Sequence, residues 1–592
     1  MLEEYAKSSK TAEKTFLVYQ ARSWTFKQTY ETVLRYAGWL HSTYHVKPKE
    51  IIAIDFMNCP QFIFLTLALW SLGALPAFIN YNLTSTPLIH SVRSSTARLL
   101  VVDPEVRSAI SPEVLSALTS PTFRSGSSGG PTELVFLEKD FETSLSYYSA
   151  YRAPDEVRSS TTAKDIAVLI YTSGTTGLPK PAIISWSRLI AGCLFGGNWT
   201  GLRPCTSPNP DRFYTCMPLY HASAFILGFC TSLLRPNTLV LGHRFSTKTF
   251  WHDVRENNAT VIQYVGETLR YLLAAPSIAD PANPGRNLDK DHNVRIAFGN
   301  GLRPDVWDKF KQRFGIETIA EIYAATEGAG GCFNYSSNSF ASGAVGRTGA
   351  ILDLLVSREV TLVKHDFATE LPYRNPTTGF CEKPARGTPG EALYALDAND
   401  IAEKYQGYLN NDEATKKKIL RNVFKKGDAW FRTGDLVRCD KEGRWYFVDR
   451  IGDNYRWKSE NVSTNEVSEV LGHHSRVLEA NVYGVQIPGH DGRAGCAAVL
   501  LNTTKPSTED LESLAILAIN SLPKYAVPIF LRLVKEVQAT GTNKQQKHVL
   551  RTQGIDPDQI PAEDRIYWLR NGTYVPFERK DWNALNAGKV RL

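Results

Sequence analysis

The sequence has few of the features that mark secreted, anchored or nucleic-acid-binding proteins. Its nine cysteines form no CxxC pair and have no regular spacing, and an odd number cannot complete a disulfide framework. A reducing compartment is therefore favoured over a secretory one. Residues 1–5 contain no basic region followed by an apolar core, which argues against a signal peptide or N-terminal anchor. The formal net charge is +7, but basic residues are spread along the chain, so no nucleic-acid partner is expected.

Charge is also missing from one long stretch, since no Asp, Glu, Lys or Arg occurs between Phe56 and Val92. Residues 62–79 are mostly apolar, and their number is at the lower limit for a membrane span. Gly73 and Pro76 instead fit a helix that ends before a strand at residues 77–79. We therefore expect a buried helix followed by a strand, with peripheral membrane contact left open.

The composition is that of a large α/β protein. With 592 residues, 43% of them hydrophobic and 21% charged, the chain can bury a large core and should form more than one globular unit. Residues 23–26 read as a strand that leads into an amphipathic helix, and residues 99–103 read as a buried strand. Repeated alternation of strands and helices predicts an α/β sheet architecture.

The segment Tyr171–Lys180 carries the strongest chemical signal. It joins two apolar runs, residues 166–170 and 182–184, so it is expected to connect two strands. Its two glycines allow the backbone to approach a ligand closely, and its hydroxyls and lysine suit phosphate oxygens. The residues concerned are Thr172, Ser173, Gly174, Thr175, Thr176, Gly177 and Lys180.

The spacing in this segment is not that of a P-loop. A P-loop has its lysine directly after the second glycine and opens a helix, whereas Lys180 follows Gly177 by three positions and precedes an apolar run. A simple Gly/Thr-rich hairpin turn is the alternative. We favour a phosphate-binding loop because the phosphate-binding groups are dense and both flanks are apolar.

This loop resembles the signature of the adenylate-forming superfamily, which contains acyl-CoA synthetases, luciferases and peptide-synthetase adenylation domains. The resemblance implies a large N-terminal multi-sheet α/β domain, residues 1–449, which binds ATP and the acid. A small, mobile α+β domain, residues 450–592, would follow a hinge at about residues 450–453. It further implies that ATP and Mg²⁺ are used and that Thr176 contributes to the metal site.

Three motifs of the same superfamily follow in the middle of the chain. Residues 323–327 resemble Tyr-Gly-x-Thr-Glu, with alanine in place of the usual glycine. The resemblance implies that the tyrosine and its neighbour flank adenine, that the threonine binds phosphate and that the glutamate holds Mg²⁺. A Gly-Asn-Gly loop is similar to the loop of the superfamily that packs against adenine and the acyl carbonyl. A Pro-Leu-x-His segment is similar to the segment of the superfamily that borders the acyl pocket. The residues are Tyr323, Ala324, Thr326 and Glu327, then Gly299, Asn300 and Gly301, and His221.

Two further motifs lie in the last third. Residues 432–435 resemble Arg-Thr-Gly-Asp, which implies that Asp435 binds the ribose hydroxyls, and Arg450 would contact ribose or phosphate. Residues 540–544 resemble Thr-Gly-Thr-x-Lys, which implies that Lys544 is the catalytic lysine of adenylation. Lys547 is a close competitor, and an exposed lysine face is the alternative for both.

The segment after Arg450 narrows the resemblance to one branch. Residues 450–464 resemble the very-long-chain acyl-CoA synthetase and fatty acid transport protein branch, and the resemblance extends over nearly the whole chain from Trp24. We do not expect the N-terminal membrane helix that is common in that branch. Ser459 occupies a position at which that branch usually has glycine. The resemblance places this position near the path of the pantetheine arm of CoA, so it implies transfer to CoA less strongly than adenylation.

The expected activity is ATP-dependent activation of a long- or very-long-chain fatty acid, or a similar lipophilic carboxylic acid, through an acyl-adenylate to its CoA thioester. The alternatives are a fatty acid uptake protein that acts by acylation and a ligase that passes the acyl group to a carrier-protein thiol. A kinase is disfavoured by the loop spacing. The terminal residues 590–592 resemble a peroxisomal address or are a frayed tail. The expected location is intracellular: peroxisomal, peripheral to a membrane, or cytoplasmic.

Overall fold

The structure of the protein is a computed structural model. It describes residues 1–120, 131–172, 178–283, 285–349, 358–366, 369–458, 460–488, 490, 492–536 and 547–590. These residues form two compact units. The first comprises Met1–Gly301, Phe310–Asn338 and Leu396–Leu420, and the second comprises Leu302–Lys309, Ser339–Ala395 and Arg421–Leu592. The boundary expected between residues 449 and 450 stays a prediction.

The first unit is an α/β structure with many short elements. Its strands are β1 (Thr15–Tyr19), β2 (Arg22–Thr25), β3 (Ile51–Asp55), β4 (Leu75–Ile79), β5 (Leu99–Val102), β6 (Glu133–Phe136), β7 (Ile166–Thr172), β8 (Lys180–Ser185), β9 (Arg212–Thr215), β10 (Thr238–Leu241), β11 (Val261–Val265), β12 (Ile296–Asn300), β13 (Thr318–Ala324) and β14 (Gly331–Ser336). Its α-helices are α1 (Leu2–Lys7), α2 (Phe26–Tyr44), α3 (Pro60–Ser71), α4 (Ser85–Ser94), α5 (Pro112–Thr119), α6 (Phe141–Leu145), α7 (Trp186–Trp199), α8 (Thr231–Leu234), α9 (Phe250–Glu256), α10 (Gly266–Ala274) and α13 (Asp412–Lys417). It also contains the short helices η1 (Arg107–Ala109), η3 (Asp155–Arg158) and η6 (Ile401–Glu403) and the π-helix η4 (Ser223–Cys230). Three elements cross between the units: α11 (Pro304–Phe314), β20 (Ile419–Arg421) and β19 (Gly390–Leu396), of which only the last residue belongs to the first unit.

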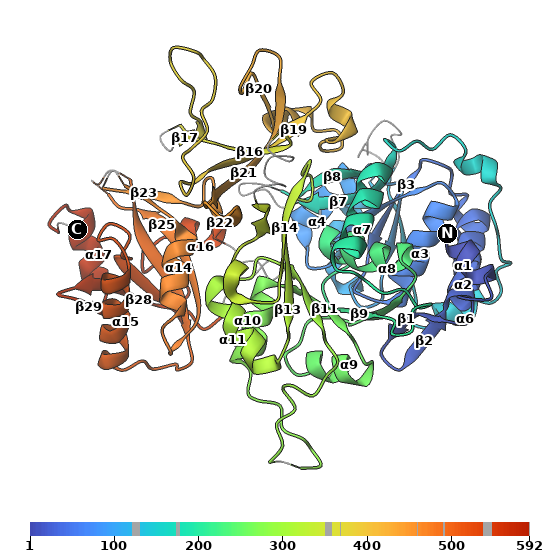
Figure 1. The fold of residues 1–592 in the computed structure, drawn as a ribbon, viewed down its shortest axis with the longest axis horizontal. Helices are drawn as coiled ribbons and strands as arrows, with labels where there is room; N and C mark the ends of the chain where they lie inside the picture. The colour runs from blue at the N-terminus through green and yellow to red at the C-terminus, as the bar shows by residue number, and fades with distance from the viewer. Residues whose placement is uncertain are drawn as a thin grey trace. The chain divides into compact units, whose positions relative to one another are not determined.

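Two large, mainly parallel sheets organise this unit. One has the strand order β14-β13-β12-β11-β9-β10-β1-β2, and the other β6-β5-β3-β4-β7-β8. Central strands such as β3 and β5 are buried and almost wholly apolar, as expected for parallel strands covered on both faces. Antiparallel pairs close the edges, among them β7 with β8, and α7 lies along this pair (Figure 1).

The uncharged stretch folds as the sequence predicts. Residues 60–71 form α3 and residues 75–79 form β4, and both are buried. Gly73 takes a φ of +73°, a left-handed conformation that favours glycine and lets the chain reverse between the two elements. In the part of the chain that the structure describes, no helix is both long enough and apolar enough to cross a membrane.

The second unit contains a sheet formed by strands between residues 346 and 450 and a separate C-terminal sheet. Its elements are η5 (Ser339–Ala341), β15 (Gly346–Arg347), β16 (Val360–Val363), β17 (His365–Asp366), β18 (Leu371–Pro372), β19 (Gly390–Leu396), β21 (Ala429–Cys439), β22 (Arg444–Arg450), β23 (Tyr455–Trp457), β24 (Glu460–Val462), α14 (Thr464–Gly472), β25 (Val477–Gln486), β26 (Arg493–Leu501), α15 (Thr508–Ser521), β27 (Phe530–Leu533), α16 (His548–Gln553), β28 (Arg565–Arg570), β29 (Thr573–Pro576) and α17 (Arg579–Asn586). The first of these sheets has the order β15-β22-β21-β19-β16, and the C-terminal sheet β25-β26-β27-β28-β29.

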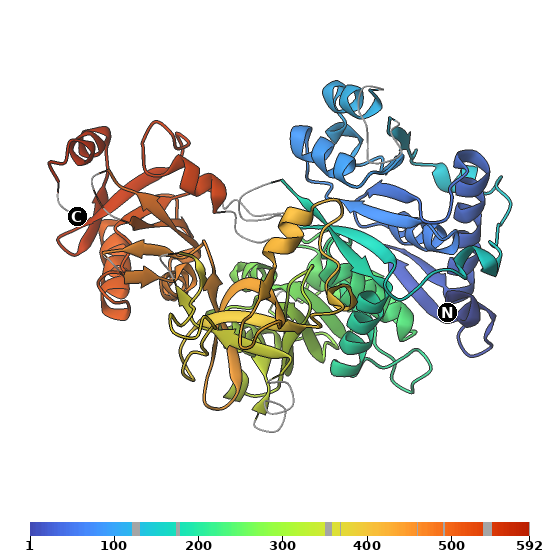
Figure 2. The same cartoon turned by 90° about the horizontal axis from the view of Figure 1, so that it is seen from above.

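The C-terminal sheet has a core of its own. Helices α14 and α15 pack against it and are visible in the orange and red part of the chain in Figure 2. Val482, Leu514 and Phe530 are almost completely buried there. The strands near residues 477–487 and 496–501 and the helix near 509–522 were predicted, and all three are present. This α+β arrangement is the one expected for the C-terminal region.

Candidate active site

The predicted phosphate loop connects β7 to β8, as the apolar flanks indicated. Thr172 and Lys180 lie directly opposite each other in this antiparallel pair, one at each end of the loop. Ser173, Gly174, Thr175, Thr176 and Gly177 lie outside the described residues. The Lys180 ammonium lies 5.8 Å from the ring centroid of Tyr408, in cation–π contact.

Glu327 is a buried carboxylate of the predicted site. It follows β13, which ends with the half-buried Tyr323 and the exposed Ala324, and half-buried Thr326 precedes it. Its residue exposure is only 9%. The Tyr408 hydroxyl donates a hydrogen bond of 2.9 Å to Glu327 Oε1.

A positive charge lies beside the same carboxylate oxygen. Lys418 Nζ is 3.6 Å from Glu327 Oε1. Burial by itself raises the pKa of Glu327, but the charge of Lys418 and hydrogen bonds from a backbone N–H and from Tyr408 outweigh it, so the pKa is below its usual value. Glu327 is therefore an ionised carboxylate at neutral pH, which is the form that binds a hard cation.

A buried arginine holds the backbone on both sides of Glu327. Arg188, in the first turn of α7, donates to the carbonyl oxygens of Thr326 at 2.7 Å and Gly328 at 2.8 Å, and also to Ile183 at 2.9 Å. Burial lowers the pKa of Arg188 to about 10, so its guanidinium remains charged at neutral pH. These bonds tie residues 326–328 to the end of β8.

We expect Arg188→Met to lower kcat/KM for ATP about tenfold and to raise the Mg²⁺ concentration needed for half-maximal rate. The substitution removes this donor from three partly buried carbonyls, and a misplaced Glu327 holds a cation less well. Steady-state kinetics over a Mg²⁺ series measures both quantities. Arg313→Met is the matched control, because Arg313 also donates to backbone carbonyls, those of Leu272, Leu273, Ala275 and Pro276. An equal shift in Mg²⁺ dependence for both variants would contradict a specific role for Arg188.

The sequence analysis missed Arg188, Tyr408 and Lys418. The polar run after Tyr408, residues 410–412, signals a turn before a helix and nothing more specific. These side chains meet Glu327 from segments between 81 and 140 residues apart in the chain. The spacing of residues within a short motif does not predict contacts between segments this far apart.

The Gly-Asn-Gly segment at the end of β12 has a structural requirement of its own. A Cβ added at Gly299 would lie 2.2 Å from the Tyr264 carbonyl oxygen on β11, so the neighbouring strand alone demands glycine there. Gly301 is exposed and takes a φ of +77°, which again favours glycine. Contact of Gly299, Asn300 and Gly301 with adenine stays a prediction.

The segment before His221 is fixed by one buried amide. Asn58 accepts from the Leu219 N–H at 2.9 Å and donates to the Met217 carbonyl at 2.9 Å. His221 is half-buried and precedes the π-helix η4. Of the apolar residues that follow, Phe225 and Phe229 are fully buried and belong to the ordinary core.

In the second unit, two predicted nucleotide-binding residues lie together. Asp435 on β21 and Arg450 on β22 are direct cross-strand partners, with 3.7 Å between Arg450 Nε and Asp435 Oδ1. Thr433 accepts from the Asp435 N–H at 3.1 Å. Arg432 forms two hydrogen bonds, 2.9 and 2.8 Å, with the fully buried Glu391, which anchors this part of β21.

Lys547 is enclosed in a polar cluster of the second unit. Its ammonium donates to the Thr464 hydroxyl and lies 3.9 Å from Asp453 Oδ2. Asp449, which is 2% exposed, accepts from the Thr464 N–H at 2.6 Å. Lys544 and Ser459 lie outside the described residues, as do the last two residues of the chain. Lys547 thus has a structural role of its own.

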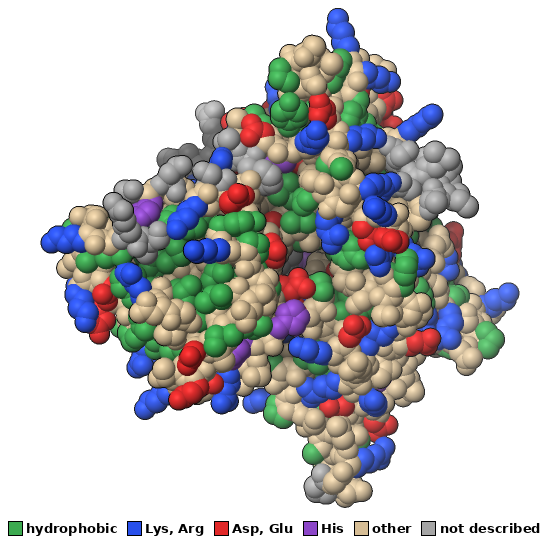
Figure 3. Space-filling view, turned by 60° about the vertical axis from the view of Figure 1, so that its left-hand side comes forward, with side chains coloured by type: hydrophobic (Ala, Val, Ile, Leu, Met, Phe, Trp, Pro, Cys, Tyr) green, Lys and Arg blue, Asp and Glu red, His purple; other side chains and the backbone are tan. Residues whose placement is uncertain are grey.

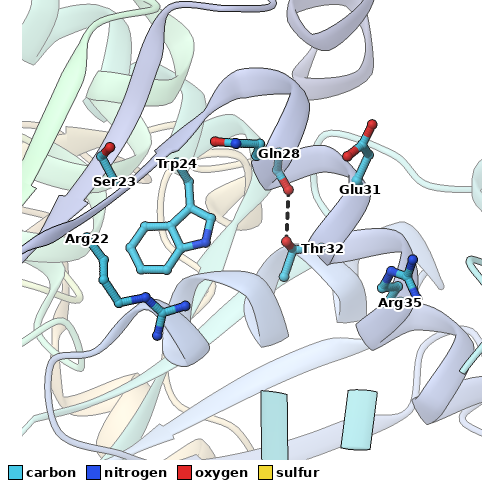
Figure 4. A pocket seen from close by; sticks show the side chains of 7 residues that line it. All are labelled: Arg22, Ser23, Trp24, Gln28, Glu31, Thr32 and Arg35. Atoms are coloured by element: carbon cyan, nitrogen blue, oxygen red, sulfur yellow. Dashed lines mark hydrogen bonds between the residues drawn. The ribbon is translucent and has the colours of Figure 1, made fainter. Parts of the chain in front are cut away.

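A shallow cavity of about 410 Å³ lies on the first unit between β2 and α2 (Figure 4). It contains none of the predicted site residues. Arg22 pairs with Glu142 at 2.6 Å and covers the Trp24 ring, and Thr32 donates to the Gln28 carbonyl. Arg22 and Thr32 are therefore already engaged in contacts of their own. Basic and acidic side chains are also interspersed on the face drawn in Figure 3.

The two-unit α/β fold, the loop between β7 and β8 and the Glu327 site together define an adenylate-forming enzyme. The chain matches the AMP-binding enzyme family over residues 3–369 and the AMP-binding enzyme C-terminal domain over residues 466–544, and it belongs to this family. The predicted superfamily and its acyl-CoA synthetase branch are confirmed.

Relatives of known name cover nearly the whole chain. It is 38% identical to the very long-chain fatty acid transport protein of Saccharomyces cerevisiae, over 97% of this chain and 84% of that one. It is also 38% identical to isopenicillin N epimerase component 1 of Hapsidospora chrysogena, over 96% and 86%. The structure of an anthranilate CoA ligase in complex with anthranoyl-AMP superposes with a TM-score of 0.73 at 19% identity, covering 93% of this chain and 96% of that one. This last similarity confirms the predicted fold class.

Proposed function

We propose that the protein converts a long- or very-long-chain fatty acid, or a similar lipophilic carboxylic acid, through an acyl-adenylate into its CoA thioester. The observation that supports this acid class is the similarity over 97% of the chain to a relative named as a very long-chain fatty acid transport protein. Membership of the AMP-binding enzyme family supports the adenylation step.

Attack of a carboxylate on the α-phosphate of ATP brings two anions together, so the barrier is largely electrostatic. Lys180, the loop hydroxyls between Thr172 and Thr176, and Thr326 would hold the phosphates. Lys544 would neutralise charge where the carboxylate meets the α-phosphate. These groups act by position and charge and form no covalent bond with the substrate.

The residues present fit a magnesium ion. Glu327 offers an ionised carboxylate, and Thr176 would add a hydroxyl. Among the described residues no group of three or more His, Cys, Asp or Glu side chains could hold a metal. A shared site with the nucleotide phosphates is therefore expected, which is how Mg²⁺ is usually bound. When bound, Mg²⁺ supplies charge neutralisation of the triphosphate.

The remaining predicted residues would orient the nucleotide and the acid. Asp435 and Arg450 are already paired across β21 and β22, and the Asp435 carboxylate offers two acceptors for the two ribose hydroxyls. Tyr323, Ala324 and residues 299–301 would flank adenine, His221 would border the acyl chain, and Ser459 would lie near the pantetheine arm of CoA.

The test is product analysis of the purified protein with ATP, Mg²⁺ and a panel of acids, with and without CoA. The panel contains fatty acids of increasing length and isopenicillin N, because one of the relatives is named for that compound. AMP, pyrophosphate and acyl-CoA formed from long-chain acids are the expected products. ADP would contradict adenylation, and an acyl-adenylate that persists in the presence of CoA would favour a carrier-protein thiol as acceptor.

We expect Ser459→Gly to raise the rate of thioester formation severalfold and to leave adenylate formation unchanged. A serine side chain occupies space and can bond the pantetheine arm, whereas glycine leaves the path open. Each half-reaction is measured separately, the first by pyrophosphate release without CoA and the second from preformed acyl-adenylate. A parallel change in both half-reactions would contradict this role.

Peripheral membrane contact and a peroxisomal or other intracellular location belong to the same proposal. A fatty acid uptake protein that acts by acylation is the alternative within it. Sedimentation of the purified protein with liposomes tests the uptake role, because uptake requires stable binding to the bilayer. Recovery of the protein in the supernatant would count against uptake.

A further inference from the structure

Two side chains from one segment reach the same oxygen of Glu327. Tyr408 donates to Oε1 at 2.9 Å, and Lys418, the residue after α13, lies 3.6 Å from it. The Glu327 side chain is 11% exposed and the Lys418 side chain 27%. The carboxylate is therefore enclosed, while the ammonium keeps partial access to solvent.

A second lysine, Lys180, lies against the ring of Tyr408. The Lys180 ammonium is 5.8 Å from the ring centroid of Tyr408. Tyr408 thus contacts the Lys180 ammonium through its ring and Glu327 through its hydroxyl. Glu327, Tyr408 and the two lysines, Lys180 on β8 and Lys418 after α13, therefore form one linked group at the predicted phosphate site.

A carboxylate with so little exposure needs a positive charge beside it. Lys418 supplies this charge in the structure. A divalent cation on Glu327 would take over the same role, and it would repel an ammonium group only a few ångströms away. A bound triphosphate offsets this repulsion, because its negative charge attracts both the cation and the long, flexible side chain of Lys418.

We propose that Lys418 is the resting counter-ion of Glu327 and turns to the nucleotide phosphates when the nucleotide and the divalent cation arrive together. Tyr408 holds the carboxylate in place throughout. It follows that the protein without nucleotide binds free divalent cations weakly. This inference rests on the proposed use of ATP with Mg²⁺, and it adds Lys418 to the nucleotide site as a positioning residue.

The first test measures Mn²⁺ binding without nucleotide, by the electron paramagnetic resonance signal of free Mn²⁺. The full chain is compared with Lys418→Met, Lys418→Gln and Lys418→Arg. Loss of the like charge is expected to tighten Mn²⁺ binding about tenfold in the two neutral variants. Lys418→Arg retains the charge and should behave as the unmodified protein. Adding Glu327→Gln to Lys418→Met should abolish the gain.

Lys417→Met is the matched control. Lys417 is the neighbouring lysine, but it pairs with Glu413 at 2.6 Å and its side chain is 73% exposed. This variant should leave Mn²⁺ binding unchanged. Melting temperatures of the variants check that each is folded, and the two neutral variants at position 418 provide independent readings.

The second test measures ATP binding in the presence of Mg²⁺ by calorimetry. We expect about tenfold weaker binding for Lys418→Met and no change for Lys417→Met. Unchanged Mn²⁺ affinity in both neutral variants would overturn the resting role, and unchanged ATP affinity would overturn the turn toward the phosphates. Neither measurement needs an acid or CoA, so failure of the proposed acid or acceptor would leave both tests intact.

Discussion

Lys544→Met is expected to slow acyl-adenylate formation about a hundredfold with little change in melting temperature. Lys547→Met is expected to lower the melting temperature with little change in that rate. Removing one charge that faces the reacting phosphate typically costs this much in rate. Pyrophosphate release in the absence of CoA measures the step. The two lysines lie three positions apart, and the sequence leaves both open as the catalytic residue.

The structure gives the reason for the different expectation at Lys547. Its side chain is 11% exposed and its ammonium lies among Thr464, Asp453 and the buried Asp449. Removing one partner from a buried charge cluster typically costs about 3–5 kcal/mol, because the remaining charges lose their compensation. Thermal unfolding of the C-terminal region reports this loss. If Lys547→Met slowed adenylation a hundredfold and left the melting temperature unchanged, Lys547 would be the catalytic lysine in place of Lys544.

Asp55→Asn is expected to raise the melting temperature by several degrees at pH 8 and to change it little at pH 5. Asp55 ends β3, is fully buried, and neither of its carboxyl oxygens has a hydrogen-bond partner within the described structure. Burial, and to a lesser degree the charge of Asp103, raise the pKa of Asp55 to about 7.

The direction of the pH dependence follows from linkage. The unfolded chain releases this proton near pH 4, but the folded protein retains it until about pH 7. The folded state therefore binds more protons between these values, and the free energy of unfolding falls as the pH rises through this window. Three pKa units correspond to about 4 kcal/mol. Asparagine has the same shape and no charge, so Asp55→Asn is expected to remove this fall in the free energy of unfolding.

Differential scanning fluorimetry at a series of pH values checks this prediction. Asp103→Asn is the control, because Asp103 accepts hydrogen bonds from the N–H groups of Met57 and Glu105. That variant should be less stable at pH 5 and at pH 8. A melting-temperature difference between Asp55→Asn and the unmodified protein that does not vary with pH would show that Asp55 does not titrate in this range.

Much of the fold could be predicted from local patterns. The apolar runs on both sides of Tyr171–Lys180 predicted the hairpin of β7 and β8, and Gly73 with Pro76 predicted the break between α3 and β4. Each of these depends on side chains close together in the sequence. Hydrophobic periodicity and turn-forming residues are local properties, so they survive without knowledge of the tertiary structure.

By itself the sequence determined the fold class, the family and the position of Glu327, because short motifs and apolar periods encode them. Only the tertiary structure decided that Tyr408 and Lys418 contact this carboxylate while Arg188 holds the backbone beside it, that Lys547 is enclosed, and that Asp55 has no hydrogen-bond partner among the described residues. These facts depend on contacts between distant segments and on burial. Neither can be read from spacing, because packing brings together residues that the chain keeps far apart.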